Sequence, residues 1–404
     1  MVRHTHFPPG DERCEGMSLV ASPILFILIT LSGMSYSLLG TMLPEMSRTY
    51  HLTASQVSSL PLAQFLGDFS GLIVLGLLLS RPRALLIAGA LLLAASALTL
   101  GFIASFSPVI KVTFFFYGAA TAVLVTIPGM IVARLEPSRA ARTLNLIYAF
   151  FSVGVMAAPL IAGAFLSWVT SYRLVFMGFG ILAALGAGLA TFAALPCPEL
   201  GTGLVLSSIK KLLVEHRRLF LAVCLMTFFY VAAETVPNAY IPKYLSDTFT
   251  GASDFRGALV LSLFWGAITL GRFICATLLE HGAPPRLTLA GLAVLSGVCL
   301  LLAAWTGHRL AAEILFAVSG LFLSGMFPIL VGYSGDLAPS ASGSFFILVQ
   351  AVGMLGASMA GKAVGVLTDT FNFSTGMTLA VPLALLILVM IPLLPRKEKE
   401  IVSK

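Results

Sequence analysis

The composition of the chain is that of an integral membrane protein. Of its 404 residues, 58% are hydrophobic and only 10% are charged. Soluble globular domains carry about 25% charged residues, so this balance excludes an ordinary water-soluble protein. The net charge is +7, which we attribute to basic cytoplasmic loops and to contact with anionic lipid, with no nucleic-acid partner.

Apolar segments long enough to cross a bilayer recur along the whole chain, since a crossing needs about 20 residues. In the first half they lie at 18–42, 57–79, 84–105, 109–134, 141–166 and 171–195. In the second half they lie at 218–242, 257–279, 285–305, 309–334, 341–366 and 372–394. We therefore predict an all-α membrane protein with 12 transmembrane helices in two pseudo-symmetric six-helix bundles.

The segments between these spans set the expected domain organisation. We expect a cytoplasmic N-terminal tail (1–17), a first bundle (18–195), a cytoplasmic linker (196–217), a second bundle (218–394) and a cytoplasmic C-terminal tail (395–404). No small-residue cleavage site follows the first apolar run, so that run is expected to be an uncleaved anchor. The linker contains prolines and glycines and leads into a basic amphipathic stretch, SIKKLLVEHRR.

The distribution of lysine and arginine predicts the orientation. Placing both termini in the cytoplasm puts most basic loop residues on that side, as the positive-inside rule requires. The chain is thus expected to be a multi-pass plasma-membrane protein, in the inner membrane if the source is bacterial, and a monomer.

The sequence carries none of the patterns of an enzyme or a metal site. Its five cysteines are isolated, so neither disulfides nor a metal site is predicted. A Walker loop, a G-x-S-x-G motif and a histidine pair at metal-ligand spacing are all missing from the sequence. We expect no catalysis and no cofactor.

The two halves resemble copies of one another. Span starts recur at an offset of about 200 residues, and LEPSRA (135–140) is echoed by LAPSAS (337–342). Parallel six-helix repeats with a site near the midplane between them are the architecture of the major facilitator superfamily, which the chain therefore resembles.

The loops after the second and eighth spans resemble the signature loop of that superfamily, G-x-x-x-D-R-x-G-R. The first copy reads GLLLSRPR, with Arg81 and Arg83 but with Ser80 where the acid belongs, and the second copy retains the acid as Glu280. The resemblance implies that Arg81, Arg83 and Glu280 are gating or charge-partner residues.

Three motifs in the second half are similar to the fucose and glucose/galactose proton symporters of the superfamily. They are SLFWGAITLGRF (262–273), GLFLSGMFPILVGYSGDLAP (320–339) and QAVGMLGASMAGKAVGVLTD (350–369). The resemblance implies sugar or polyol uptake coupled to protons by alternating access. The chain departs from that family on the first and fourth spans, where the family carries acids and this chain has none, so its coupling acid must lie elsewhere or its coupling must differ.

Two other transport functions stay open. A run in the fifth span, Gly154 to Gly163, resembles an antiporter motif and would suit efflux of amphipathic compounds. Uptake of a small organic anion would suit the basic residues at membrane depth.

Ionisable residues inside a membrane are costly, of order 3 kcal/mol for a charge at the centre, so each is a functional candidate. Glu234 belongs to a polar stripe of the seventh span, together with Thr227, Tyr230 and Asn238. A low-dielectric site favours the protonated form of a carboxylic acid, so we expect Glu234 to carry the coupled proton and Tyr230 and Asn238 to bind substrate. The alternative is a protonated glutamate held in a helix-packing hydrogen bond.

Asp68, in the second span, is the other acid at membrane depth that could carry the proton. Gln64 lies one turn before it and is expected to bind substrate. The alternative is an interhelical latch from Asp68 to a group such as Gln350.

Two basic residues are expected to act as gate or charge partners. Arg272 shares a face of the eighth span with Trp265, which we expect to stack on substrate. Arg272 could instead act only as a conformational gate, and a permanent ion pair with Glu234 is not expected because the two are about 10 Å apart along the membrane normal. Lys362 could bind an anionic substrate or extend to the membrane interface.

The remaining expected site residues are uncharged or close a span. Substrate contacts are assigned to Tyr36, Asn145, Tyr148 and Gln350, and a gating role to Asp336.

Overall fold

The structure is a computed structural model, and it describes residues 23–79, 81–135, 140–168, 171–192, 214, 217–251, 253–337 and 342–394. These residues are helical apart from short turns and contain no β-strand. They form 12 helical spans long and apolar enough to cross a membrane, which confirms the predicted fold class. The predicted tails and most of the predicted linker lie outside the described residues.

The first half of the chain forms six spans, one of them broken by a turn. Its helices are α1 (Pro23–Tyr50), α2 (Ala54–Val57), α3 (Ser59–Leu78), α4 (Pro82–Phe102), α5 (Pro108–Leu135), α6 (Ala140–Trp168) and α7 (Tyr172–Phe192). A capping box between Thr53 and Gln56 begins α2. Pro82 begins α4 at the one helical position where its missing N–H costs nothing.

The second half repeats this arrangement, with breaks in its tenth and twelfth spans. Its helices are α9 (Arg217–Thr248), α10 (Asp254–Glu280), α11 (Pro285–Trp305), α12 (Arg309–Leu323), α13 (Met326–Leu337), α14 (Ser342–Thr370), α15 (Phe373–Thr378), α16 (Ala380–Met390) and η3 (Ile391–Leu393).

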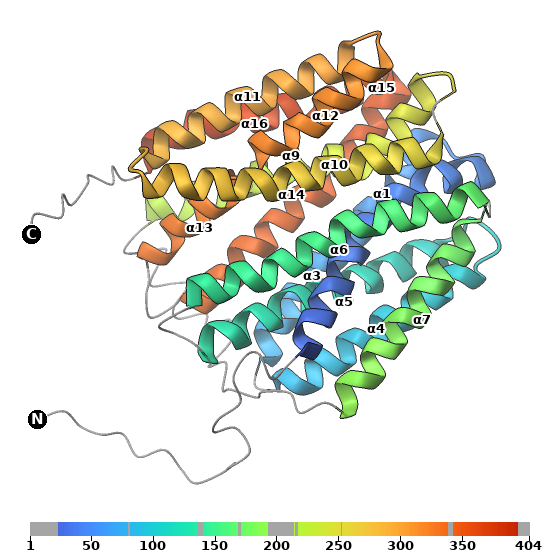
Figure 1. Ribbon diagram of the computed structural model, residues 1–404, viewed down its shortest axis with the longest axis horizontal. Helices are drawn as coiled ribbons and strands as arrows, with labels where there is room; N and C mark the ends of the chain where they lie inside the picture. The colour runs from blue at the N-terminus through green and yellow to red at the C-terminus, as the bar shows by residue number, and fades with distance from the viewer. Residues whose placement is uncertain are drawn as a thin grey trace, which may run out of the picture.

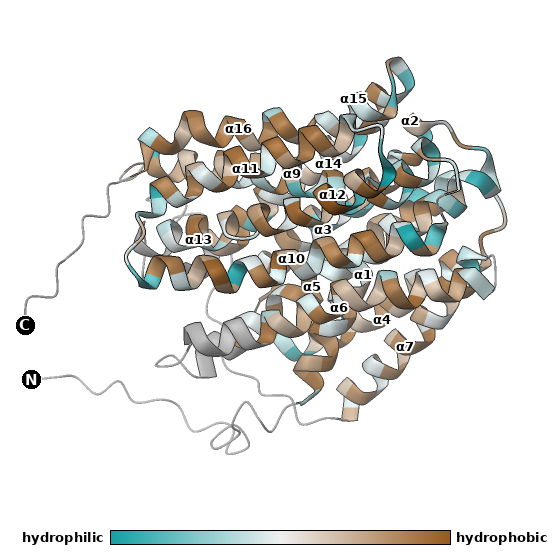
Figure 2. Ribbon diagram, turned by 45° about the horizontal axis from the view of Figure 1, so that its top comes forward, coloured by the Kyte–Doolittle hydropathy of each residue, from teal (hydrophilic) through white to brown (hydrophobic). Residues whose placement is uncertain are grey.

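The two halves lie side by side, with the blue-to-green helices on one side and the yellow-to-red helices on the other (Figure 1). Their most extensive contacts join α3 with α14, α6 with α10, and α1 with α9, and further contacts join α2 with α14 and α1 with α10. Hydrophobic residues follow the lengths of the helices, and hydrophilic residues gather toward the ends (Figure 2). We call the end where α1 begins and η3 ends the terminal end, and the opposite end the distal end.

Close contact between α3 and α5 positions part of the interface between the halves. A Cβ atom added at Gly67 would lie 1.9 Å from the Phe115 carbonyl oxygen, and one added at Gly118 would lie 1.9 Å from the Gln64 carbonyl oxygen. Only glycine permits this approach, so the two helices pack backbone to backbone. This packing fixes the position of α3 where it carries Gln64 and Asp68.

Two helices extend further than the hydropathy of the sequence predicts. α1 reaches Tyr50 instead of ending near 42, and α9 reaches Thr248 instead of ending near 242. Pro237 and Pro242 lie inside α9, and the helix continues through both. Each proline lacks an N–H, so the carbonyl four residues earlier loses its intrahelical donor.

Candidate functional site

The polar stripe of α9 lies buried at the centre of the molecule. Glu234 is 6% exposed, and Thr227, Tyr230 and Asn238 are at least as well covered. The Tyr230 hydroxyl donates a hydrogen bond to Oε2 of Glu234, one turn further along the helix. The acid therefore has a neutral donor beside it at membrane depth.

An aromatic cluster joins both halves next to this stripe. The indole Nε1 of Trp265 on α10 donates to Oδ1 of Asn238 on α9 at 2.9 Å. The Trp265 ring meets the ring of Tyr36 on α1 edge to face, with centroids 5.7 Å apart. Phe65 on α3 and Phe151 on α6 pack against the other sides of Tyr36. Helices of the first half thus contact α10 of the second half through one aromatic group.

The α3 face beside this cluster holds buried polar atoms without partners. Gln64 is 1% exposed and Asp68 is 3% exposed. Both side-chain atoms of Gln64 and Oδ2 of Asp68 have no hydrogen-bond partner among the described residues. Buried polar groups are nearly always satisfied, so these atoms point to a proton, a water molecule or a solute as their partner.

Arg272 places a positive charge near Glu234 without pairing with it. Tyr36 lies within electrostatic range of Glu234, Asp68 and the Arg272 guanidinium. No ion pair within 4.0 Å joins Arg272 to an acid among the described residues. Its Nη1 instead faces the Ser152 hydroxyl at 3.4 Å, and its Nε has no partner among the described residues.

A sequence profile of the Major Facilitator Superfamily matches residues 25–361. The chain belongs to this superfamily. The first resemblance drawn from the sequence is thereby confirmed.

A curated relative carries the name of a transporter. A protein of Helicobacter pylori (strain J99) named "Putative glucose/galactose transporter" is 25% identical over 260 residues, which cover 59% of this chain and 61% of the relative. The chain thus matches less than two thirds of that protein. This relative corresponds in name to the narrower family that the second-half motifs resemble.

Solved structures of superfamily members share the fold. A D-xylose-proton symporter has a TM-score of 0.74 at 13% identity, and the match covers 93% of this chain and 97% of that one. The Escherichia coli fucose:proton symporter has a TM-score of 0.64 at 19% identity, with 93% and 98% covered. At these identities the likeness shows the superfamily fold and nothing finer.

Not every expected site residue lies in this central region of the superfamily fold. Oε1 of Gln350 on α14 accepts a hydrogen bond from Thr126 at 3.3 Å. Oδ2 of Asp68 has no partner, so that oxygen does not form the latch to Gln350 that we considered. Tyr148 on α6 lies within electrostatic range of Arg272. The side chains of Asn145 and Asp336 lie outside the described residues.

The expected gating residues of the superfamily loops lie at the terminal end, far from the aromatic cluster along the helices. Arg81, Arg83 and Glu280 are all exposed. Arg83 donates to the Thr191 carbonyl at 3.2 Å. Arg81 directly precedes α4.

Lys362 lies away from the central site. Its ammonium donates to the carbonyl oxygen of Ser55 at 2.7 Å and to the hydroxyl of the same residue at 2.8 Å. Because Ser55 belongs to α2, this lysine joins α14 of the second half to the first half at the distal end.

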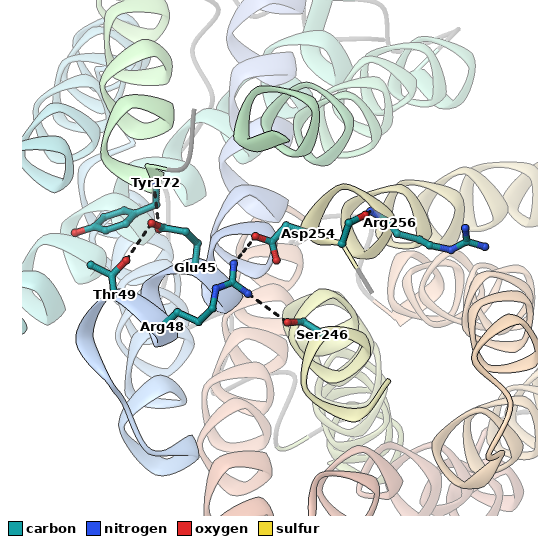
Figure 3. A network of polar contacts seen from close by, with 8 residues as sticks. Glu45, Arg48, Thr49, Tyr172, Ser246, Asp254 and Arg256 are labelled. Carbon is teal, nitrogen blue, oxygen red and sulfur yellow. Dashed lines mark hydrogen bonds and ion pairs between the residues drawn. The ribbon is translucent and has the colours of Figure 1, made fainter. Parts of the chain in front are cut away.

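Sequence reasoning missed a set of polar contacts between the halves at the distal end (Figure 3). Arg48 near the end of α1 pairs with Asp254 at the start of α10 and faces the hydroxyl of Ser246 on α9 at 3.4 Å. Lys243 on α9 donates to the Ser47 hydroxyl at 2.9 Å. We call these contacts of Ser47 and Arg48 with α9 and α10 the distal latch.

A further distal contact fixes α14 on α2. The Asp369 carboxylate accepts hydrogen bonds from the backbone N–H groups of Ala54 at 3.0 Å and Ser55 at 2.8 Å. In the sequence all of these residues lie between the predicted spans, which does not identify a partner for any of them.

Proposed function

We propose that the chain is a secondary active transporter that moves a small polar solute, a sugar or a polyol, across the membrane by alternating access. The superfamily membership and the names of the relatives support transport. The observation that carries the solute class is the buried Gln64 amide, which offers two donors and an acceptor with no partner. Hydroxyl groups both donate and accept, so a polyhydroxylated solute matches an amide in this position.

The aromatic cluster supports the same solute class. Trp265 presents an apolar ring whose N–H is already held by Asn238, and Tyr36 lies against its edge. Apolar faces of sugar rings stack on such surfaces, while their hydroxyls require polar groups at the sides. The α3 and α9 polar residues would supply those groups from opposite halves of the molecule.

We propose proton coupling through Glu234, with Asp68 as the second candidate. Glu234 is buried and has no ion pair among the described residues, so its charged form is costly at this depth. The Tyr230 hydroxyl donates to Oε2 of Glu234, and Arg272 lies within electrostatic range of the same acid. A conformational change that admits water or brings Arg272 closer would favour proton release.

Transport into proteoliposomes tests this proposal. With an inward proton gradient, we expect wild-type protein to accumulate a labelled neutral hexose. Accumulation of a carboxylic acid without any accumulation of sugar would contradict it.

The Glu234→Gln variant tests the coupling role separately from solute binding. We expect it to lose gradient-driven accumulation and to retain counterflow exchange, because an amide keeps the shape and cannot release a proton. If both activities persist, Glu234 does not couple, and Asp68→Asn becomes the decisive variant.

Arg272 supports a second candidate function, uptake of a small organic anion. Its Nε lacks a partner among the described residues, and guanidinium groups bind carboxylates well. A thermal-shift comparison of hexoses with small carboxylates distinguishes the two candidate functions. Arg272→Gln should abolish stabilisation of the protein by a carboxylic acid and leave stabilisation by a hexose in place. Lys362 gives this candidate no further support, because it contacts Ser55 of α2 at the distal end, away from the central site.

Efflux has less support from the geometry. A Cβ atom added at Gly154 would lie 2.1 Å from the Thr30 carbonyl oxygen. This part of the antiporter-like run therefore serves close packing of α6 on α1, whatever the direction of transport.

We propose that both termini face the cytoplasm and that the protein works as a monomer in the plasma membrane. Under this orientation the distal end faces outward. Labelling of single cysteines in intact cells by an impermeant reagent tests it, with reactivity expected at Gly251 and not at His281 after substitution of each by cysteine.

A further inference from the structure

A groove lies at the distal end between α3 and α5 of the first half and α14 of the second half. Its volume is about 570 Å³, within the ~300–1,000 Å³ range of small-molecule pockets. The residues that line it are Ser59, Leu62, Ala63, Leu66, Lys111, Val112, Phe115, Phe116 and Lys362. We call it the distal groove, and it contains none of the residues assigned to the central site.

The outer wall of the distal groove faces the lipid. Val112 is 53% exposed and Phe116 is 46% exposed, although both lie inside the membrane span formed by α5. Exposed apolar side chains along a membrane span contact acyl chains, so this wall is open to the bilayer.

Two lysines, one serine and no acid line this groove, and its other lining residues are apolar. Lys111 lies three residues into α5, about 5 Å along the axis from its start, so it is near the membrane interface. Its ammonium lies 5.3 Å from the centre of the Phe106 ring and has no anionic partner among the described residues. The Lys362 ammonium donates two hydrogen bonds to Ser55. An ammonium group has three N–H donors, so one of them is left for a ligand.

The nearest acid on α14 does not neutralise this pair. Asp369 accepts from the backbone N–H groups of Ala54 and Ser55. No ion pair joins it to Lys362 in the part of the chain that the structure describes. The groove therefore combines an apolar trough with net positive charge at its rim.

We propose that the distal groove binds one anionic phospholipid. Its phosphate contacts Lys111 and Lys362, and an acyl chain lies along Leu62, Ala63 and Phe116. Basic pockets between membrane helices select anionic headgroups by charge, and the apolar lining favours a lipid over free phosphate.

Binding at this position affects the packing of the two halves. The groove has walls from α3 and α5 in the first half and a wall from α14 in the second. Any movement that separates α14 from α2 and α3 at the distal end takes the groove apart. A ligand stabilises the arrangement to which it binds, so the lipid favours the closed distal end, whichever solute the protein carries.

Lipid retention by the purified full chain in detergent tests the proposal. We expect native mass spectrometry to show tighter retention of phosphatidylglycerol than of phosphatidylcholine with the same acyl chains. Lys111→Gln should weaken phosphatidylglycerol retention about fivefold, because a basic residue near an anionic surface contributes about 1 kcal/mol. Lys111→Gln combined with Lys362→Gln should weaken it about 20-fold.

Arg173→Gln provides the matched control. Arg173 is a cation at the start of α7 at the same end of the molecule, where it donates to the Ala104 carbonyl at 3.1 Å and lies outside the groove. We expect this substitution to leave lipid retention unchanged. An equal loss in Lys111→Gln and Arg173→Gln would show a general surface charge effect and would overturn the proposal.

Two further measurements distinguish binding of the headgroup from binding of the acyl chain. Ala63→Leu fills the groove and leaves both lysines in place, so it should lower phosphatidylglycerol retention. Inorganic phosphate should not raise the Tm of the wild type as phosphatidylglycerol does. Equal retention of the two phospholipids, or equal stabilisation by free phosphate, would contradict a lipid site.

Discussion

Trp265 combines a hydrogen bond and a ring contact at the point where the two halves meet. Its indole N–H satisfies Asn238, and its ring touches Tyr36. Trp265→Phe should retain the ring contact and leave Oδ1 of Asn238 without its donor. We expect solute binding about 5- to 10-fold weaker, since a net hydrogen bond contributes about 1 kcal/mol.

The affinity of the purified protein for a hexose measures this effect. Trp305→Phe is the control, because Trp305 also donates through its indole N–H, to Thr378 at 2.8 Å, but is 58% exposed at the distal end. Equal affinities in the two variants would contradict a role for Trp265 at the solute site.

The Gln64 amide is expected to lower the stability of the solute-free protein and to raise its affinity for solute. Each buried polar group without a partner costs about 1–3 kcal/mol, and both side-chain atoms of Gln64 are in this state. Gln64→Leu should therefore raise the Tm of the solute-free protein and lower its affinity for solute. A higher Tm with unchanged affinity would show that the amide does not contact solute.

At the scale of the helix, the seam between α3 and α5 sets the position of that amide. A Cβ atom at Gly118 would lie 1.9 Å from the Gln64 carbonyl oxygen, so Gly118→Ala must push the helices apart. We expect a loss of roughly 2 kcal/mol or more, seen as a lower Tm and poor recovery in size-exclusion chromatography. Gly178→Ala on α7 is the control, because an added Cβ there meets nothing within 4 Å.

Helices were predictable from the sequence, but the distal ends of α1 and α9 were not. Long apolar runs identify spans because lipid requires every backbone hydrogen bond to be satisfied within the helix. The distal parts of α1 and α9 contain Glu45, Arg48 and Lys243, which lower the hydropathy although the backbone stays helical. Their side chains find partners on other helices, and no local pattern in the sequence records that.

At the scale of the whole molecule, the central site also has one part that the sequence predicts and another part that it does not. The α9 stripe follows from helical periodicity, since residues three and four apart share a face. The contact between Tyr36 and Trp265 joins residues in opposite halves and depends on how the halves pack. Lys362 illustrates the limit, because its depth in the span suggested a substrate role, whereas its ammonium binds Ser55.

The distal latch is expected to control the balance between conformations of the whole molecule. Arg48 and Ser47 contact α9 and α10 only while the halves are together at this end. Exposed ion pairs contribute about 0.2–1 kcal/mol, so Arg48→Gln should increase the population open at the distal end by up to about fivefold. Adding Lys243→Gln should increase it further.

The labelling rate of a single cysteine measures this population. Thr41 is buried in α1 between the latch and the aromatic cluster, so Thr41→Cys in a cysteine-free background should react with an impermeant maleimide only when the distal end opens. Arg309→Gln is the control, because Arg309 pairs with Glu313 within the second half. If Arg48→Gln and Arg309→Gln change the rate equally, the latch does not hold the halves together and the closed distal end must depend on the α14 contacts with α2.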